Sequence, residues 1–423
     1  MTENTSKNTL HSGIESISPD SITGMIFAME GMRNTVVLLN GPMGCRFYHS
    51  TTSQYLTIRP VLYLPEGEDG KKAPVDYNTL NDWFFRQERV PCTYLDGYDY
   101  VYSTRDKVSS ALDYISKNID FDIIAIVNSP GAALIGDNLL EIAREKLGNR
   151  RVVMLESSGY SLGFSEGCSD ALLAMLKQVG APAWEGRRPA KEERSVNLLG
   201  LSIWHRNIEG DLEELRRMLG LCGIKVNAVP CAGCSFEELE ALPRAALNVV
   251  VYPETGLAAA EYLKETLGMP FYLCDDLPLG FSSTEKIVSD ICSLLGCSKD
   301  AFMEDSKKAR ALAWYKIREI SQAYGKPKGV RFYVDGDPSV ARSYTAFLRD
   351  YLGMEPSAAE EAELVFSNAN VISELMLKNR TFCGIEISFP GMGYTDLIPK
   401  THLGVKGSLF LIEQVLNGLM SRI

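Results

Sequence analysis

The sequence has little histidine and lacks two short motifs by which enzymes are commonly identified. Four histidines occur in 423 residues, and they are scattered along the chain. A catalytic metal site built on histidine is therefore not expected. The chain contains neither a GxxxxGK[ST] phosphate loop nor an HExxH zinc motif. These absences argue against P-loop nucleotide hydrolysis and against HExxH metalloprotease chemistry.

Long apolar runs and basic runs are also missing. No apolar stretch approaches the roughly 20 residues that a membrane-spanning helix requires. Residues 1–21 are polar, without the basic and apolar regions of a secretory signal. Lysine and arginine total 43 against 54 aspartates and glutamates, a net charge of −11. Because nucleic-acid phosphates are bound by clustered lysine and arginine, we expect no nucleic-acid partner, no membrane partner and a cytoplasmic location.

Cysteine, by contrast, is well represented, with ten residues. In a cytoplasmic protein these thiols are expected to be reduced, so each is either a small buried apolar side chain or a ligand or reactive group. Soft thiolate ligands favour iron–sulfur clusters, copper(I) or zinc. With so few histidines, a thiolate-bound iron–sulfur cluster is the metal chemistry that the composition favours.

Short apolar runs alternate with helical stretches along the chain, which is typical of βα units and predicts an α/β fold with parallel sheets. The predicted strands are 34–39, 121–127, 151–155, 197–203, 225–229, 246–252, 270–273, 329–334 and 363–366. The charged, proline-containing segment 181–194 is interpreted as a surface linker. We predict three α/β units: 1–190 with the candidate site loops, 191–298, and 299–423, which begins with a long crossover helix.

Helix ends are predicted from capping residues. Ser235, with Glu238 three residues later, forms a capping-box pattern. The apolar spacing of 211–219 predicts a helix that ends at Gly220. The broad apolar face of 408–419 predicts a buried final helix.

In parallel α/β sheets, ligands bind in the loops that follow the carboxyl ends of the strands. The most informative such loop is 40–50, NGPMGCRFYHS. Gly41 and Gly44 let the backbone turn tightly and approach a bound group. Cys45 stands where the next helix would begin, and a helix N-terminus lowers the pKa of a thiol and favours the metal-binding thiolate. His49 would share its helix face; the alternative is a tight connection with a buried cysteine.

Three further loops carry weaker signals. The segment 128–137, NSPGAALIGD, has no thiol or imidazole, and the shaping of a helix start, with Asp137 as its cap, explains it as well as ligand binding does. Cys92 follows a proline in an irregular segment and is either a ligand or a packed thiol. Cys231 and Cys234 form a CxxC before a capped helix, which suits a redox pair or half a zinc site. No second CxxC completes such a site, so packing at the helix start is the simpler interpretation.

Three motifs occur in order along the chain: GPMGC (41–45), SPGAALIGDNL (129–139) and ESSGYSLGFSEG (156–167). Further similarity continues through 246–279 and ends in THLGVKGSLFLIEQVLNGL. This ordered set, which spans nearly the whole chain, resembles the nitrogenase component 1 family. The family includes nitrogenase subunits, cofactor scaffold proteins, the dark-operative protochlorophyllide reductase and the nickel-tetrapyrrole reductase of coenzyme F430 synthesis.

The resemblance implies three Rossmann-like domains in a subunit that forms a homodimer, or a heterodimer with a paralogous subunit. It also implies an iron–sulfur cluster of the 4Fe–4S type near the dimer interface. In the family this cluster takes electrons from an ATP-hydrolysing iron protein and passes them to a substrate or to a second metallocofactor.

The resemblance also suggests which residues hold the cluster. The family's first domain typically supplies three cysteines, of which the middle one is Cys45. The first would fall near 18–19 and the third at Ser129, and this chain has cysteine at neither place. Cys92 lies between these loops and is the expected replacement. We therefore expect Cys45 and Cys92 to be metal ligands, two from each of two chains, because such a cluster commonly takes four thiolates. The residues expected to line the cluster pocket are Gly41, Gly44 and Ser129.

Nitrogenase's own cofactor-ligating cysteine would fall near 251–253, where this chain has none. A nitrogen-reducing cofactor site is therefore not expected. The expected function is that of a subunit in an ATP-dependent oxidoreductase complex that relays electrons through the shared cluster. Two alternatives stay open: a non-catalytic scaffold or carrier for a metallocofactor, and a structural partner of an active paralogous subunit. The substrate is also left open, because fold alone does not fix function.

Overall fold

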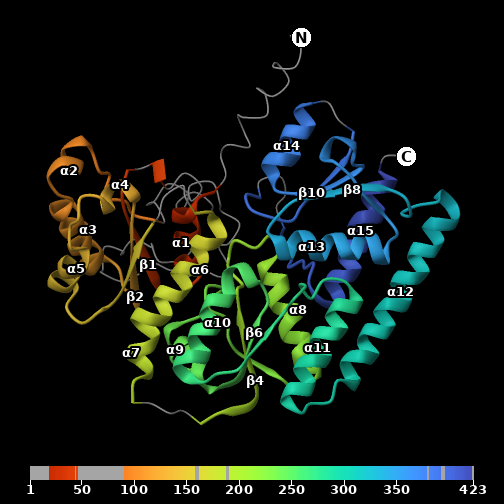
Figure 1. Cartoon of the computed structure of the whole chain (residues 1–423), viewed down its shortest axis with the longest axis horizontal. Coiled ribbons are helices and arrows are strands. Elements are labelled where there is room, and N and C mark those ends of the chain that lie inside the picture. Colours follow the sequence, from red (N-terminus) through yellow and green to blue (C-terminus); the bar gives the residue numbers. More distant parts are fainter. Residues whose placement is uncertain are drawn as a thin grey trace, which may run out of the picture. The chain divides into compact units, whose positions relative to one another are not determined.

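A computed structural model of the chain describes residues 19–42, 44–45, 90–157, 162–186, 190–378, 381–391 and 396–421. These residues form two compact units, and Figure 1 labels most of their helices and several of their strands. The first unit is Pro19–Arg188 with Pro230–Glu240, and the second is Pro189–Val229 with Ala241–Ile423, as far as these ranges are described. Both units are built on parallel sheets, as the alternating sequence pattern predicts.

The first unit holds a parallel sheet of three strands in the order β1–β2–β3. The strands are β1 (Thr35–Asn40), β2 (Ile123–Asn128) and β3 (Arg151–Glu156). Its helices are α1 (Ser21–Glu30), α2 (Gly97–Tyr102), α3 (Arg105–Asn118), α4 (Pro130–Ala133), α5 (Leu139–Leu147), α6 (Phe164–Met175), α7 (Ala181–Trp184) and α9 (Phe236–Glu240). Every residue of β1 and β2 is buried, which is why these strands are unbroken apolar runs in the sequence.

Helices cover both faces of this sheet. On one face, apolar side chains of β1 and β2, among them Leu38 and Ile126, pack against α3 and α5. On the other face, α1 contacts β1 and α6 contacts β3, and the two helices pack against each other. A Cβ atom at Gly24 of α1 would lie 2.0 Å from the Phe164 carbonyl oxygen, and one at Gly167 of α6 would lie 2.1 Å from the Ser21 carbonyl oxygen. Glycine at both positions therefore lets the two helix backbones touch.

The second unit holds two parallel sheets of four strands each, in the orders β5–β4–β6–β7 and β11–β10–β8–β9. The first comprises β4 (Glu192–Leu199), β5 (Lys225–Ala228), β6 (Ala245–Val250) and β7 (Phe271–Leu273). The second comprises β8 (Arg331–Val334), β9 (Glu355–Pro356), β10 (Leu364–Ser367) and β11 (Cys383–Glu386). The three-sheet α/β architecture expected from the sequence is thus present.

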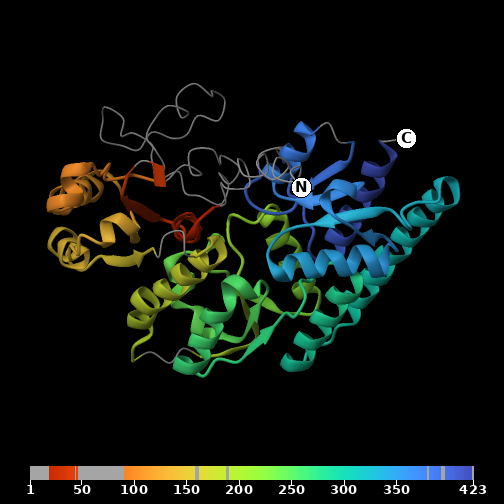
Figure 2. The same ribbon diagram turned by 45° about the horizontal axis from the view of Figure 1, so that its top comes forward.

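The helices of the second unit connect and cover these sheets. They are α8 (Ile208–Leu221), α10 (Pro253–Leu267), α11 (Phe281–Leu295), α12 (Asp300–Tyr324), α13 (Pro338–Ala346), α14 (Ala369–Leu377) and α15 (Gly404–Met420). The long helix α12 runs alongside α11, as both Figure 1 and the turned view in Figure 2 show. Across the described residues, no helix is both long and apolar enough to cross a membrane.

Paired asparagines connect neighbouring strands inside two of the sheets. In the first unit, Asn40 Nδ2 donates to Asn128 Oδ1 at 3.0 Å between β1 and β2. In the second unit, Asn227 Nδ2 donates to Asn197 Oδ1 at 2.8 Å, and Asn197 Nδ2 donates to Asn248 Oδ1 at 2.8 Å, so the amides link β5, β4 and β6. Each pair of amides satisfies polar groups that would otherwise be buried without a partner.

Several local predictions are corrected by the structure. The segment 181–194 is not a continuous loop, because it contains α7 and the first residues of β4. The boundary between the two compact units nevertheless falls within it, between Arg188 and Pro189. Two of the charged residues that suggested a surface loop, Glu193 and Arg194, lie exposed near the start of a strand whose later residues are buried. Gly220 does not end its helix, since α8 continues to Leu221 and Gly223 supplies the positive φ of 70° that follows. The short strands β9 and β11 have no counterpart among the predicted strands.

Two other local predictions have different outcomes. The capping box is confirmed: the Ser235 amide donates to Glu238 Oε2 at 2.9 Å, and the Glu238 amide donates to Ser235 Oγ at 3.2 Å. The boundaries between α/β units at 190/191 and 298/299 stay predictions.

Candidate functional site

The candidate site lies at the carboxyl edge of the first sheet, where β1 and β2 end side by side. Asn40 and Asn128 are the last residues of these strands and oppose each other in the parallel register. The Gly41 loop follows the first strand, and Ser129 follows the second. The Ser129 amide donates to the Asn40 carbonyl oxygen at 2.9 Å, which holds the two loops together. This is the edge at which parallel sheets bind ligands.

Close packing at this edge requires glycine at position 41. A Cβ atom at Gly41 would lie 2.8 Å from Ser129 Oγ, and the Gly41 amide donates to Thr93 Oγ1 at 3.0 Å. Gly44 is different: it is exposed, and a Cβ atom there would meet nothing within 4 Å. The described residues therefore explain Gly41, and they offer no packing reason for Gly44.

The segment around Cys92 lies beside β1 as a further strand-like stretch, in addition to β2. Cys92 pairs with Leu39 as an isolated parallel bridge, with the Leu39 amide donating to the Pro91 carbonyl oxygen at 2.9 Å. The Cys92 side chain is 8% exposed, and its thiol donates to the Gly41 carbonyl oxygen at 3.0 Å. The Tyr94 amide donates to Cys92 Sγ at 3.4 Å. The structure thus brings Cys92 to the Gly41 loop.

Cys45 is half-buried at the same edge, and its amide donates to the Pro42 carbonyl oxygen at 3.2 Å. Burial raises the pKa of its thiol, and the negative charges of Asp20 and of the Cys92 thiolate raise it further. The helix that was expected to begin at Cys45 lies outside the described residues, so its effect on this thiol stays a prediction. His49, which was expected to share the helix face of Cys45, lies outside the described residues.

Two residues at this edge carry no sequence signal for a site. Asp20, whose charge reaches Cys45, caps α1 by accepting from the Thr23 amide at 3.0 Å. Tyr100 on α2 has its pKa raised mainly by burial; the Ser129 hydroxyl lowers it, and the charges of Cys45 and Cys92 raise it. Only tertiary packing brings these two side chains to the thiols.

The loop after β2 differs from its sequence interpretation. Asn138, not Asp137, caps α5, by accepting from the Glu141 amide at 3.2 Å. Asp137 instead accepts from the Thr104 amide at 2.6 Å and from the Ser103 hydroxyl at 2.9 Å. It thereby fixes the start of α3 against the site loop.

We expect the Asp20→Asn variant to make Cys45 more reactive. Removing the negative charge stabilises the thiolate, so the pKa of Cys45 falls and its alkylation by iodoacetamide at pH 8 becomes faster, by about two- to threefold. Asparagine keeps an oxygen that can accept from the Thr23 amide, so the α1 cap is preserved. Mass spectrometry of the Cys45 peptide over time gives the rate. The exposed Asp120→Asn variant serves as the control, and equal rates in all three proteins would contradict the prediction.

The CxxC pair is buried packing and not part of this edge. Cys231 and Cys234 are both buried, and burial raises the pKa of Cys231 to about 12. A Cβ atom at Gly31 would lie 1.9 Å from the Cys231 carbonyl oxygen, and the Gly233 amide donates to the Gly31 carbonyl oxygen at 2.7 Å. The pair therefore forms a tight turn against the α1–β1 connection, which is the simpler of the two interpretations made from the sequence.

In the second unit, the loop before α15 is held to α8 by buried carboxylates. Thr401 Oγ1 donates to Asp211 Oδ1 at 2.6 Å, and the Lys406 amide donates to Glu214 Oε1 at 2.9 Å. His402 in this loop is buried: the Tyr344 hydroxyl hydrogen-bonds its Nδ1 at 2.6 Å, and its Nε2 pairs with Gln414 Oε1 at 2.5 Å. Burial lowers the pKa of His402 to about 4. Both ring nitrogens are thus engaged within the fold.

Burial raises the pKa of Asp211 to about 7, from an ordinary value of 3.8. Between these values the folded chain holds a proton that the unfolded chain releases. The stability that this proton provides is complete below about pH 4 and is lost as the pH rises to about 7, at roughly 1.4 kcal/mol per pH unit. The Asp211→Asn variant cannot ionise and does not lose this stability. We therefore expect its free energy of unfolding, relative to that of the wild-type protein, to be higher at pH 8 than at pH 5. Urea unfolding at both pH values measures this, and a pH-independent difference would contradict it.

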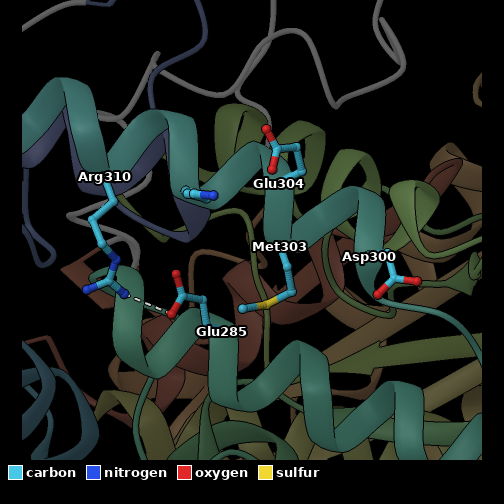
Figure 3. A pocket seen from close by; sticks show the side chains of 6 residues that line it. Glu285, Asp300, Met303, Glu304 and Arg310 are labelled. Carbon is cyan, nitrogen blue, oxygen red and sulfur yellow. Dashed lines mark hydrogen bonds and ion pairs between the residues drawn. The ribbon is translucent and has the colours of Figure 1, made fainter.

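A separate pocket of about 390 Å³ lies on the second unit, along α11 and α12 (Figure 3). Arg310 Nη2 donates to Glu285 Oε2 at 2.8 Å, and Ser306 Oγ donates to Glu285 Oε1 at 2.6 Å. The residues that line it are Glu285, Asp300, Met303, Glu304, Lys307 and Arg310. None of them is a cysteine or a histidine, so the pocket has no place in thiolate chemistry.

No group of three or more histidine, cysteine, aspartate or glutamate side chains is placed to hold a metal ion within the part of the chain that the structure describes. The thiols of Cys45 and Cys92 are therefore two donors without a third from the same described chain. Their role as metal ligands, and the roles of Gly41, Gly44 and Ser129 in the pocket, stay predictions.

Comparison with known proteins gives consistent results. The model of the nitrogenase component 1 type oxidoreductase family matches residues 21–363. A light-independent protochlorophyllide reductase subunit of Chloroflexus aurantiacus (strain ATCC 29364 / DSM 637 / Y-400-fl) is 28% identical over 319 residues, which cover 71% of this chain and 55% of that protein. The corresponding protein from Synechococcus sp. (strain WH7803) is 29% identical over 301 residues, 66% of this chain and 53% of that protein. The chain thus spans about half the length of the curated relatives that it matches.

Solved structures show the same fold. The structure of nitrogenase Cp1 at pH 6.5 superposes with a TM-score of 0.74 and 15% identity, covering 96% of this chain and 92% of that one. Nitrogenase Cp1 at pH 5 gives a TM-score of 0.70 at 16% identity, covering 96% and 88%. At this identity the likeness establishes the three-sheet architecture and leaves the chemistry to be argued from the residues.

Proposed function

Because the chain belongs to the nitrogenase component 1 type oxidoreductase family, we propose that it is a subunit of a nitrogenase-like oxidoreductase complex in the cytoplasm. In this proposal the complex relays electrons from an ATP-hydrolysing iron protein to a substrate or a metallocofactor. The relay passes through an iron–sulfur cluster, of the 4Fe–4S type, shared between two subunits. The observation that carries the proposal is that Cys45 and Cys92 lie together at the carboxyl edge of the first sheet, near enough for the charge of one thiolate to act on the other.

The chemistry of these donors fits a bound cation. Burial, Asp20 and the Cys92 charge all raise the pKa of Cys45, so its thiol is protonated at neutral pH in the chain alone. Bound iron would reverse this preference, because a metal cation stabilises coordinating thiolates and releases their protons. Cys92 would give up the proton that it now donates to the Gly41 carbonyl oxygen. When bound, the cluster supplies one-electron transfer.

The other residues of the edge would shape the pocket. Gly41 allows its loop to lie against Ser129, where any side chain would collide with the serine. Ser129 and Tyr100 present hydroxyl groups beside the thiols, and hydroxyl donors near cluster sulfurs tune a reduction potential.

The donor count supports a site shared between chains. Two cysteines of one chain supply half of the four thiolates that such a cluster commonly takes. An apolar surface lies on the same unit: Val101 of α2 is 72% exposed and Leu134, directly after α4, is 89% exposed, with Tyr98 and Tyr102 also exposed. Exposed apolar groups of this kind are typical of protein interaction surfaces. A second copy or a paralogous subunit that covers them would bring its own thiols to the cluster.

A second candidate function, a structural partner of an active paralogue, is favoured by one observation. The family position for a third cysteine is Ser129, and the described residues assemble no third metal donor. In that case the paralogue would hold the cluster by itself. A scaffold that carries a metallocofactor without turnover is the remaining alternative from the sequence.

The test is anaerobic purification of the chain, alone and co-expressed with a paralogous component 1 subunit, followed by reconstitution with ferrous iron and sulfide. We expect a dimeric species with visible cluster absorbance and an EPR signal on reduction. If iron binds the paralogue equally well without this chain, the structural-partner function is correct. If neither preparation retains iron, the electron-relay proposal fails.

A further inference from the structure

Thr93, the residue after Cys92, is bound to the end of β1 by both its main chain and its side chain. Its amide donates to the Leu39 carbonyl oxygen at 3.0 Å, and the residue is buried. Its hydroxyl donates to Asn40 Oδ1 at 2.9 Å and accepts from the Gly41 amide at 3.0 Å. A hydroxyl has one hydrogen to donate. With Asn40 as the acceptor of that hydrogen, the oxygen is left to accept from Gly41.

The hydrogen bonds continue from Asn40 to a carboxylate. Asn40 Nδ2 donates to Thr104 Oγ1 at 3.2 Å, and Thr104 Oγ1 donates to Asp137 Oδ2 at 2.9 Å. Asn40 and Thr104 are completely buried. From the Gly41 amide to Asp137, each group therefore donates to the next in one direction. Aligned hydrogen bonds polarise and strengthen one another, and removing one link leaves buried polar groups without a partner.

Gly41 meets Cys92 through its carbonyl group. The Cys92 thiol donates to the Gly41 carbonyl oxygen at 3.0 Å, and the Leu95 amide donates to the same oxygen at 3.2 Å. A glycine has more backbone freedom than any other residue. Hydrogen bonds to both its amide and its carbonyl remove that freedom at Gly41, so the Thr93 hydroxyl also fixes the group to which Cys92 is bound.

We propose that Thr93 is a positioning residue for Cys92. Its hydroxyl fixes Gly41, and Gly41 in turn keeps the Cys92 thiol in place at the carboxyl edge of the first sheet before any metal binds. Groups that hold a metal ligand in place without touching the metal contribute to metal affinity. The use of this positioning rests on the proposed function, whereas the positioning itself is a property of the iron-free chain.

The Thr93→Val variant tests the positioning in the full-length, iron-free chain, because valine keeps the shape of the side chain and removes the hydroxyl. We expect hydrogen–deuterium exchange of the Gly41 amide and alkylation of Cys92 by iodoacetamide each to become faster, by about tenfold. Exchange resolved to single amides and mass spectrometry of the Cys92 peptide give the two rates. The Thr93→Ser variant, which retains a hydroxyl, should restore both rates to near the wild-type values.

Thr35→Val is the matched control. Thr35 is a buried threonine at the opposite end of β1, and its hydroxyl donates to the Arg33 carbonyl oxygen at 3.5 Å. This variant should leave both rates unchanged. Wild-type rates in Thr93→Val would overturn the proposal, and so would equal acceleration in Thr93→Val and Thr35→Val, which would indicate a general loss of stability. If Thr93→Val does not fold, the wild-type chain decides: a Gly41 amide that exchanges as fast as in an unfolded peptide would also overturn it.

The reconstituted complex tests what the positioning does for the cluster. We expect Thr93→Val to bind iron more weakly than the wild-type protein by about tenfold or more, as loss of a second-layer partner of a metal ligand does. Unchanged iron affinity in a variant whose iron-free rates are raised would refute a role of Thr93 toward the cluster. If the wild-type protein itself retains no iron, the proposed function fails, and the two iron-free rates still decide whether Thr93 positions Cys92.

Discussion

Replacing Cys45 with alanine is expected to remove most of the iron from the reconstituted complex. If the cluster is held by four thiolates, a homodimer of the variant loses two of them and a heterodimer loses one. Losing even an outer hydrogen-bond partner of a metal ligand costs about 10- to 100-fold in affinity, so losing the ligand itself should cost at least as much. Iron content and visible absorbance, measured after removal of free iron, report the loss. Because Cys45 is half-buried, the variant should fold normally.

Cys92 provides an internal comparison for this prediction. The Cys92→Ser variant keeps a hydroxyl that can donate to the Gly41 carbonyl oxygen, as the thiol does at 3.0 Å, and it removes only the soft ligand. We expect it to lose iron as Cys45→Ala does. The Cys168→Ala variant, which alters a buried cysteine of the same unit, should keep its iron. Wild-type iron content in both Cys45→Ala and Cys92→Ser would show that these thiols hold no cluster.

A second large effect is expected from Gly167→Ala. The added Cβ atom would lie 2.1 Å from the Ser21 carbonyl oxygen, and this contact is between helix backbones that cannot rotate away. The two helices must separate, and α1 is buried along its whole length. Overpacking of a core costs about 1–3 kcal/mol and occasionally more. We expect a cost at or above the upper end of this range, seen as a fall in the thermal midpoint.

Gly220→Ala is the matched control, because it makes the same chemical change inside a helix. A Cβ atom at Gly220 would meet nothing within 4 Å, so the change should stabilise α8 by roughly 0.5–1 kcal/mol. If the thermal midpoint falls in Gly167→Ala and rises in Gly220→Ala, then backbone contact, not helix propensity, causes the effect at Gly167. Equal midpoints would contradict the close approach of α1 and α6.

The strands that the sequence reveals are those that form continuous apolar runs of several residues. β1 and β2 are continuous apolar runs, and their positions could be predicted within one or two residues. β9 has two residues and β11 has four, and both lie at the edges of their sheet. Such short edge strands owe their conformation to pairing with a neighbour, so no local pattern marks them.

The candidate site could be predicted only where strand ends mark it. The rule for parallel sheets places the loops of Gly41 and Ser129 at one edge, and the structure brings them together as expected. Cys92 joins them through pairing with Leu39, which its irregular sequence does not signal. Asp20 and Tyr100 come from helices whose local patterns reflect capping and packing alone. The effect of Asp20 on Cys45, and that of Ser129 on Tyr100, depend on tertiary distances that a sequence does not contain.

The paired asparagines make mispaired strands costly. In an all-parallel sheet with two covered faces, apolar side chains fit almost as well when one strand slips along another. Asn40 opposes Asn128, and Asn197 opposes Asn248, in the observed registers. If one strand slipped along its neighbour, each asparagine amide would lie opposite an aliphatic side chain. Each buried polar group left without a partner would destabilise the fold by about 1–3 kcal/mol. The amides therefore act as a check on alignment while distant segments of the chain find each other, the slowest part of forming such sheets.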